Sequence, residues 1–141
     1  MLPDITILEA TDIRLSLLYD NFGIKLSNMV HLFKDELYIL AAMIANTSLA
    51  VKPGGRYKKY GEIFNAYIDS AKTLNSDNPR IYYLQGNSIF YTSKLFGGGA
   101  KKALPYYEKA VLLYQNEKAG NILSPYWGRK QNEGMLKKCK E

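Results

Sequence analysis

Apolar residues recur at helical spacing along most of the chain. In the segment 57–74, for example, Phe64, Tyr67, Ile68 and Ala71 follow one another by one or three positions. This spacing places them on one face of an α-helix. No stretch alternates apolar and polar residues over the length of a strand. The pattern therefore predicts an all-α protein.

Polar and glycine-rich stretches divide the pattern into helices. The breaks are Lys52–Gly55, Asn75–Asn78, Phe96–Gly99 and the residues just before Pro125. Because short turns join most neighbouring helices, we expect them to pack as antiparallel hairpins. The predicted hairpins cover residues 5–33, 34–74 and 78–115, and a capping helix covers residues 125–139. With 141 residues, the chain is expected to form one domain, 1–141.

Two of the predicted helices share a start motif. Asn78 is a favourable N-cap, and Pro79 suits the first helical position because its missing N–H needs no partner there. The helix that begins at Pro79 is predicted to continue to about Lys94. Ser124 and Pro125 repeat the same order of cap and proline. They predict that the last helix begins at residue 125.

The segment 34–49 is apolar on nearly every side, which predicts a central helix. Its longest apolar run, Leu37 to Ala45, has nine residues, far below the roughly 20 that cross a bilayer. We therefore expect no membrane insertion of a helix. The first residues lack a basic region followed by a long apolar run, so we expect no signal peptide in this chain.

Two segments of the chain share the same spacing of apolar residues. In each, a first apolar residue is followed by others four, seven and ten positions later. These residues are Phe64, Ile68, Ala71 and Leu74 in one segment, and Ala103, Tyr107, Ala110 and Leu113 in the other. We interpret each segment as the second helix of a hairpin. Small residues there let two helices approach closely, while the larger ones fill the groove between them.

The helix between these segments has the pattern of the first helix of a tetratricopeptide repeat. An aromatic residue, Tyr82, is followed four positions later by Gly86 and three positions after that by Ile89. Gln85 departs from the pattern, which usually has leucine there. The turn before Ala103 is also longer than usual by roughly five residues.

A longer stretch resembles a group of uncharacterised tetratricopeptide-like proteins from Bacteroidetes-type bacteria. The landmarks are the run NPRIYYLQGNSIFYTSKLFGGGAKKALPYYEKAV and the later SPYWG, and the similarity covers roughly residues 34–140. The resemblance implies a short right-handed superhelix of α-hairpins. Members of the group often look exported, so it also implies a periplasmic or exported protein whose signal peptide lies outside this chain. It implies no activity.

Charge is unevenly distributed along the chain. The net charge is +6, with an acidic front (residues 1–51) and a basic remainder. Arg56, Lys58 and Lys59 flank aromatic residues, a mixture that binds single-stranded nucleic acid in some proteins. No nucleic-acid-binding motif accompanies it, so we favour a solvated helix start and regard nucleic acid as an unlikely partner.

The sequence contains no arrangement of residues typical of catalysis. His31 and Cys139 are the only histidine and the only cysteine, which excludes an intrachain disulfide and a two-histidine zinc site. We expect no enzyme activity, no cofactor and no metal. The oligomeric state stays open.

Tyr83, Asn87 and Tyr91 are the candidate partner-binding residues. They lie on a different helical face from Tyr82 and Gly86, and first helices line the concave side of a superhelix. Core packing of these aromatic residues is the alternative. Trp127 is expected to fasten the last helix to the preceding hairpin.

The glycine run Gly97–Gly99, followed by Lys101 and Lys102, allows two interpretations. Backbone N–H groups at a helix start can bind a phosphate. We favour a turn that needs positive φ angles, because the spacing of a phosphate-binding loop is absent.

Two functions remain after these exclusions. We predict a non-catalytic interaction module that binds a peptide or partner protein in a concave helical groove. The alternative is an accessory protein of an exported transport or uptake system that binds a small molecule or an anion.

Overall fold

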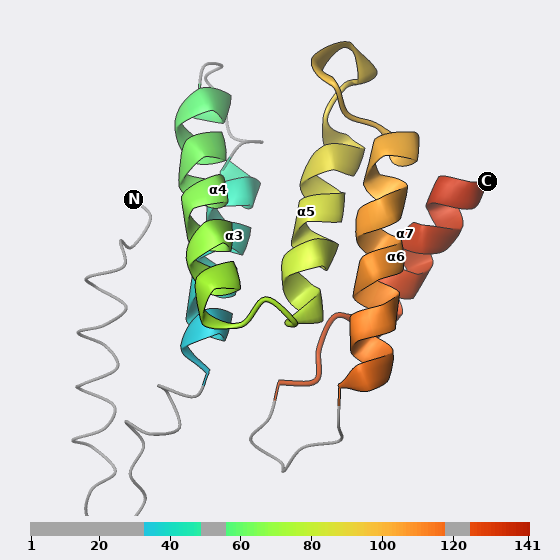
Figure 1. The fold of residues 1–141 in the computed structure, drawn as a ribbon. Helices are drawn as coiled ribbons and strands as arrows, with labels where there is room; N and C mark the ends of the chain where they lie inside the picture. Colours follow the sequence, from blue (N-terminus) through green and yellow to red (C-terminus); the bar gives the residue numbers. More distant parts are fainter. Residues whose placement is uncertain (1–32, 49–55, 118–124) are drawn as a thin grey trace, which may run out of the picture. The chain divides into compact units, whose positions relative to one another are not determined.

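The computed structural model describes residues 33–48, 56–117 and 125–141, and it is all-helical over these ranges. The predicted hairpin 5–33, apart from its last residue, lies outside the described residues, as do His31 and the break Lys52–Gly55. The chain divides into two compact units, residues 1–75 and 76–141. Figure 1 shows the helices of both units.

The first unit contains a hairpin of two helices, α3 (Lys34–Ser48) and α4 (Arg56–Leu74). The core between them consists mainly of aromatic, isoleucine and alanine side chains. The rings of Tyr38 and Tyr67 lie 6.5 Å apart, centre to centre. At the open end of the hairpin, Asn75 Nδ2 donates a hydrogen bond of 3.2 Å to the Asp35 carboxylate.

Burial of α3 is one-sided, although the apolar residues on nearly every side of the segment 34–49 predicted a central helix. α3 buries Ile39, Ala42 and Ala45, whereas Leu40 and Ile44 on the other side are exposed. α4 is the helix that packs on α3 among the described elements, and one partner can cover only one face.

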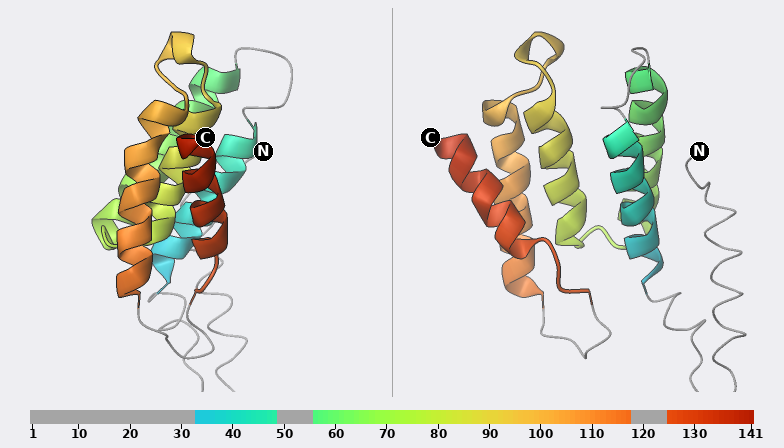
Figure 2. Two further views of the ribbon diagram at one scale, coloured as in Figure 1. Left: turned by 90° about the vertical axis from the view of Figure 1, so that its right-hand side faces the viewer. Right: turned by 180° about the vertical axis from the view of Figure 1, so that it is seen from behind.

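The second unit contains α5 (Pro79–Tyr91), a 3₁₀ turn η2 (Lys94–Phe96), α6 (Ala100–Asn116) and α7 (Arg129–Lys140). Helices α5 and α7 both pack on α6, as the two views of Figure 2 also show. The buried residues of α6 are Ala103, Tyr107, Ala110 and Tyr114. Central α6 therefore supplies most of the contact surface of this unit.

Gly86 permits the close approach of α5 and α6. A Cβ atom at this position would lie 2.7 Å from Cε1 of Tyr107, so no side chain fits without movement of that ring. Gly86, the glycine of the repeat pattern, therefore faces the paired helix α6.

The repeat spacing predicted burial correctly at its first three positions. Phe64, Ile68 and Ala71 are buried in α4, and the corresponding residues are buried in α6. The fourth position differs, because Leu74 is exposed at the end of α4. In α6 it is Tyr114, one residue after Leu113, that is buried.

Helix α5 ends three residues earlier than the predicted Lys94. Thr92 already has extended backbone angles, and its Oγ1 donates a 2.7 Å hydrogen bond to the Ser88 carbonyl. Ser93 then caps the 3₁₀ turn, since its Oγ accepts from the Leu95 N–H. Threonine and serine thus compete with the helix for backbone partners.

The prediction that the last helix begins at residue 125 is wrong. α7 begins at Arg129, directly after Gly128, which has a φ of 97°. The Gly128 carbonyl accepts the Asn132 N–H at 2.8 Å and so starts the helix. Residues 125–127 stay outside the helix because Trp127 is held by Arg80 of α5 and Tyr114 of α6.

Candidate functional site

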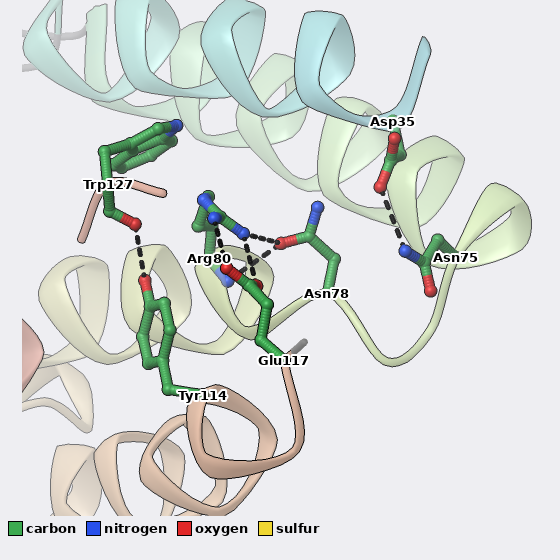
Figure 3. Close-up of polar contacts among 7 residues, drawn as sticks. All are labelled: Asp35, Asn75, Asn78, Arg80, Tyr114, Glu117 and Trp127. Atoms are coloured by element: carbon green, nitrogen blue, oxygen red, sulfur yellow. Dashed lines mark hydrogen bonds and ion pairs between the residues drawn. The ribbon is translucent and has the colours of Figure 1, made fainter. Parts of the chain in front are cut away.

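Arg80 is the centre of a polar network at the start of α5. The side chain is 2% exposed, and its guanidinium donates two hydrogen bonds, of 2.9 and 2.8 Å, to the Glu117 carboxylate at the end of α6. The N-cap residue Asn78 accepts from the Arg80 N–H and from Nη1. The network therefore joins one end of α5 to one end of α6 (Figure 3).

Two aromatic residues extend this network to the segment before α7. The Arg80 guanidinium lies 5.7 Å from the ring centre of Tyr114 and 5.5 Å from that of Trp127. Tyr114 Oη donates a 3.2 Å hydrogen bond to the Trp127 carbonyl. Gly128 is required here, since a Cβ would collide with Tyr114 Oη. We call Asn78, Arg80, Tyr114, Glu117 and Trp127 the Arg80 network, and its arrangement is structural.

A second group of side chains gathers where α5, α6 and α7 meet. Its centre is the fully buried Tyr107 of α6, with Ala103 and Met135 beside it. Several partly buried residues pack against this centre and retain some contact with solvent. These are Tyr83, Ile89 and Phe90 of α5, and Leu136 and Cys139 of α7. We call this group the Tyr107 cluster.

The phenol of Tyr107 is held inside the cluster as a neutral hydrogen-bond donor. Its Oη donates a 2.8 Å hydrogen bond to Asn87 Oδ1, and its ring lies 6.4 Å from that of Tyr83. Burial raises the pKa of Tyr107 far above its ordinary value, and the nearby ionisable groups of Cys139, Tyr83 and Tyr91 raise it further. Burial also raises the pKa of the Cys139 thiol.

A pH dependence of stability follows from Tyr107. In the unfolded chain the pKa of this tyrosine is about 10. The stabilisation of the fold by the buried neutral phenol is therefore complete below pH 10 and is lost as the pH rises above that value. Tyr107→Phe should lower the free energy of unfolding by about 1 kcal/mol at pH 8, through loss of the Asn87 hydrogen bond. At pH 11 ionisation of this tyrosine in the unfolded chain should lower the wild-type stability by about 1.4 kcal/mol, so the difference should reverse and leave the variant more stable by roughly 0.4 kcal/mol. Urea denaturation of both proteins at the two pH values measures it, and an unchanged difference would contradict the buried neutral phenol.

The structure brings the three predicted partner-binding residues to one side of α5. Tyr83 is partly buried against Tyr107, and Asn87 accepts the hydrogen bond from it, so both also serve the core. Tyr91 is 72% exposed, and its ring meets the Phe90 ring edge-on at 5.1 Å.

Sequence reasoning missed the contribution of α7 to this site. Asn132, Met135, Leu136 and Cys139 follow one another at helical spacing, which would have indicated a face that packs on α6. Asn132 Nδ2 donates a 3.0 Å hydrogen bond to the Tyr107 carbonyl, and this fixes α7 beside the cluster. The lysines at the end of this helix had indicated a solvent-exposed capping helix instead.

The glycine run forms a turn, as favoured. Gly97 and Gly99 have φ angles of 83° and 103°, and a Cβ at Gly98 would collide with the Thr92 carbonyl. All three N–H groups donate to carbonyl groups of the preceding residues. The three glycine N–H groups are therefore not available to a phosphate.

The basic and aromatic side chains that the structure describes at the start of α4 divide between surface and core. Lys58 and Lys59 are exposed, whereas Tyr60 is buried in the hairpin. The ammonium of Lys59 lies 5.4 Å from the centre of the Tyr60 ring.

The described ranges contain neither a group of metal ligands nor a membrane-spanning helix. No three histidine, cysteine or acidic side chains there are grouped closely enough to hold a metal ion. None of the helices in those ranges has the length and apolar character of a membrane span.

Comparison with known proteins gives one informative similarity. No family model matches the chain, and no curated protein matches it significantly. Among solved structures, the chain is similar to the HusA haemophore from Porphyromonas gingivalis, with 38% sequence identity and a TM-score of 0.68 over 75% of this chain. The matched region is 53% of that protein, so this chain spans about half its length.

Proposed function

We propose that this chain is a non-catalytic accessory protein that binds haem or a related flat, apolar tetrapyrrole. The observation that carries the proposal is the 38% identity to a haemophore. Binding of a small molecule by an accessory protein is one of the two functions that the sequence left open. Haem is the cargo in this proposal and not a resident cofactor.

The Tyr107 cluster is the proposed binding surface. Its partly exposed side chains, Tyr83, Phe90, Leu136 and Cys139, are aromatic or apolar and come from two helices that flank α6. Aromatic side chains offer large flat contact areas to a macrocycle. Tyr91 adds a ring that is mostly open to solvent.

Binding is proposed to depend on apolar contact more than on a bond to iron. Tyr107 is unsuited as an iron ligand, because its phenol is buried, neutral and bonded to Asn87. The raised pKa of Cys139 keeps its thiol protonated, whereas the thiolate is the form that binds metals. The acidic side chains of haem would be attracted by the last turn of α7, which contains Lys137, Lys138 and Lys140.

Titration with haemin, followed by absorbance, tests this function. We expect saturable binding by the wild-type chain and binding about tenfold weaker or more for the double variant Tyr83→Ala/Phe90→Ala, because two ring contacts are lost. The matched control is Leu112→Ala, which removes an exposed apolar residue of α6 outside the cluster and should change nothing. Iron-free protoporphyrin should bind within a few-fold of haemin.

Three results would contradict the proposal. The first is the absence of saturable binding by the wild-type chain. The second is equal affinity of the double variant and the Leu112→Ala control. The third is an affinity for protoporphyrin more than a hundredfold lower than the affinity for haemin. This result would contradict only the proposed mode of binding, because it would require a bond to iron.

The finer description of the fold is part of the same proposal. We infer that the hairpins α3–α4 and α5–α6 are tetratricopeptide-like repeats, with α7 as the capping helix. A protein or peptide partner at Tyr83, Asn87 and Tyr91 stays a prediction. It would gain support if the double variant kept full haemin affinity.

A further inference from the structure

The loop between α5 and α6 exposes two large apolar side chains at its tip. Leu95 is 85% exposed and Phe96 is 80% exposed. Both belong to the 3₁₀ turn η2, and Figure 1 shows this loop projecting past the ends of α5 and α6. The tip contains part of the stretch that is longer than a tetratricopeptide repeat requires. Neither residue belongs to the Tyr107 cluster.

The tip is held in one conformation by its own hydrogen bonds. Five successive N–H groups, from Leu95 to Gly99, donate to acceptors within residues 89–94. The positive φ angles of Gly97 and Gly99 let the chain return to α6. An apolar surface can therefore receive this turn without burying unpaired donors of these five residues, which would otherwise be costly.

The surroundings of the tip are basic. Lys94, Lys101 and Lys102 are all exposed. No acidic residue occurs from 78 to 107, and Arg80, the other basic residue in this stretch, is paired with Glu117. The tip thus combines two apolar side chains with three cations and no nearby carboxylate in the sequence.

We propose that this tip attaches the protein peripherally to the surface of an anionic lipid bilayer. Leu95 and Phe96 enter the boundary between headgroups and acyl chains, and the three lysines contact the headgroup phosphates. A convex tip of two side chains needs no complementary pocket in a fluid bilayer. Protein partners bind mainly through wider surfaces with a packed centre.

Co-sedimentation with lipid vesicles tests the attachment. We expect the wild-type chain to bind vesicles of phosphatidylcholine and phosphatidylglycerol, and to bind pure phosphatidylcholine vesicles at least about tenfold more weakly. Leu95→Ser/Phe96→Ser and Lys101→Glu/Lys102→Glu should each weaken binding to the anionic vesicles by about tenfold or more. Circular dichroism should show unchanged helix content for both variants, since all four side chains are solvent-facing.

Two matched controls test whether vesicle binding depends on the tip itself and not on exposed apolar or basic side chains elsewhere. Leu112→Ser removes an exposed apolar side chain of α6, and Lys130→Glu/Lys138→Glu reverses two exposed lysines of α7. Retention of at least half the vesicle affinity by both controls would support the tip as the attachment site.

Several outcomes would overturn the inference. They are the absence of wild-type binding to anionic vesicles, equal binding to both kinds of vesicle, and equal loss in tip variants and controls. Binding that needs native membranes and disappears after protease treatment of those membranes would assign the tip to a protein partner instead.

Discussion

Gly86→Leu should lower the free energy of unfolding by about 3 kcal/mol or more. A leucine begins with a Cβ only 2.7 Å from Cε1 of Tyr107 and then adds three further carbon atoms in the same direction. The Tyr107 ring cannot move aside easily, because it is fully buried and its hydroxyl is bonded to Asn87. Urea denaturation followed by circular dichroism measures the loss.

Gly134 offers a matched control for this substitution. It also lies inside a helix of the second unit, α7, but nothing lies within 4 Å of a Cβ built on it. Gly134→Leu should leave the stability unchanged or raise it by up to about 1 kcal/mol, since leucine favours helix more than glycine does. Similar effects of the two substitutions would show that α5 and α6 do not meet at Gly86.

Arg80→Ala should destabilise the chain by about 3 kcal/mol. The substitution removes the two hydrogen bonds to Glu117, the contact with Asn78 Oδ1, and the cation–π contacts with Tyr114 and Trp127. Arg80→Lys should recover less than half of this loss, because an ammonium cannot form the paired bonds of a planar guanidinium. Denaturant unfolding of the three proteins gives the values.

Arg129→Ala is the control for the Arg80 series. This exposed arginine forms a 3.5 Å ion pair with Glu133 on the surface of α7. Exposed pairs contribute little, so a change within about 0.5 kcal/mol is expected. If Arg80→Ala were no more harmful than Arg129→Ala, the Arg80 network would not join α5, α6 and the Trp127 segment as described.

The features that the sequence predicted well are local ones. Asn78 and Pro79 start α5 because a cap and a proline act within one turn of the chain. Gly86 faces its paired helix because helical spacing alone sets the face on which it lies. The turn at Gly97–Gly99 follows from the positive φ angles that glycine accepts. In each case the physical cause lies within a few residues.

The features that were missed depend on distant partners. α7 begins at Arg129 and not at the predicted residue 125, because Trp127 packs on Arg80, which lies 47 positions earlier in the chain. Cys139 joined the candidate site because Asn132 of the same helix bonds to the Tyr107 carbonyl. The contact of Trp127 with Arg80 has no local pattern in the sequence. The helical spacing of Asn132, Met135 and Cys139 indicates a packing face, but not that this face meets Tyr107.

The sequence motifs on which the resemblance to tetratricopeptide-like proteins rests have physical explanations in the structure. The arginine of NPR and the tryptophan and glycine of SPYWG belong to, or border, the Arg80 network. The glycines of FGGG form the turn that presents Leu95 and Phe96. Tyr83 and Phe90 of the proposed ligand surface also lie within the first landmark run, whereas Leu136 and Cys139 of α7 lie outside the landmarks.

Mapping of a bound tetrapyrrole on the protein tests the central claim most directly. Titration of the ¹⁵N-labelled chain with gallium protoporphyrin, a non-paramagnetic substitute for haemin, reports the backbone amides that the ligand affects. The account predicts saturable shifts concentrated in Tyr83–Tyr91 of α5 and Met135–Cys139 of α7. Shifts confined to the α3–α4 hairpin or to Lys94–Phe96, or no saturable shifts, would contradict it.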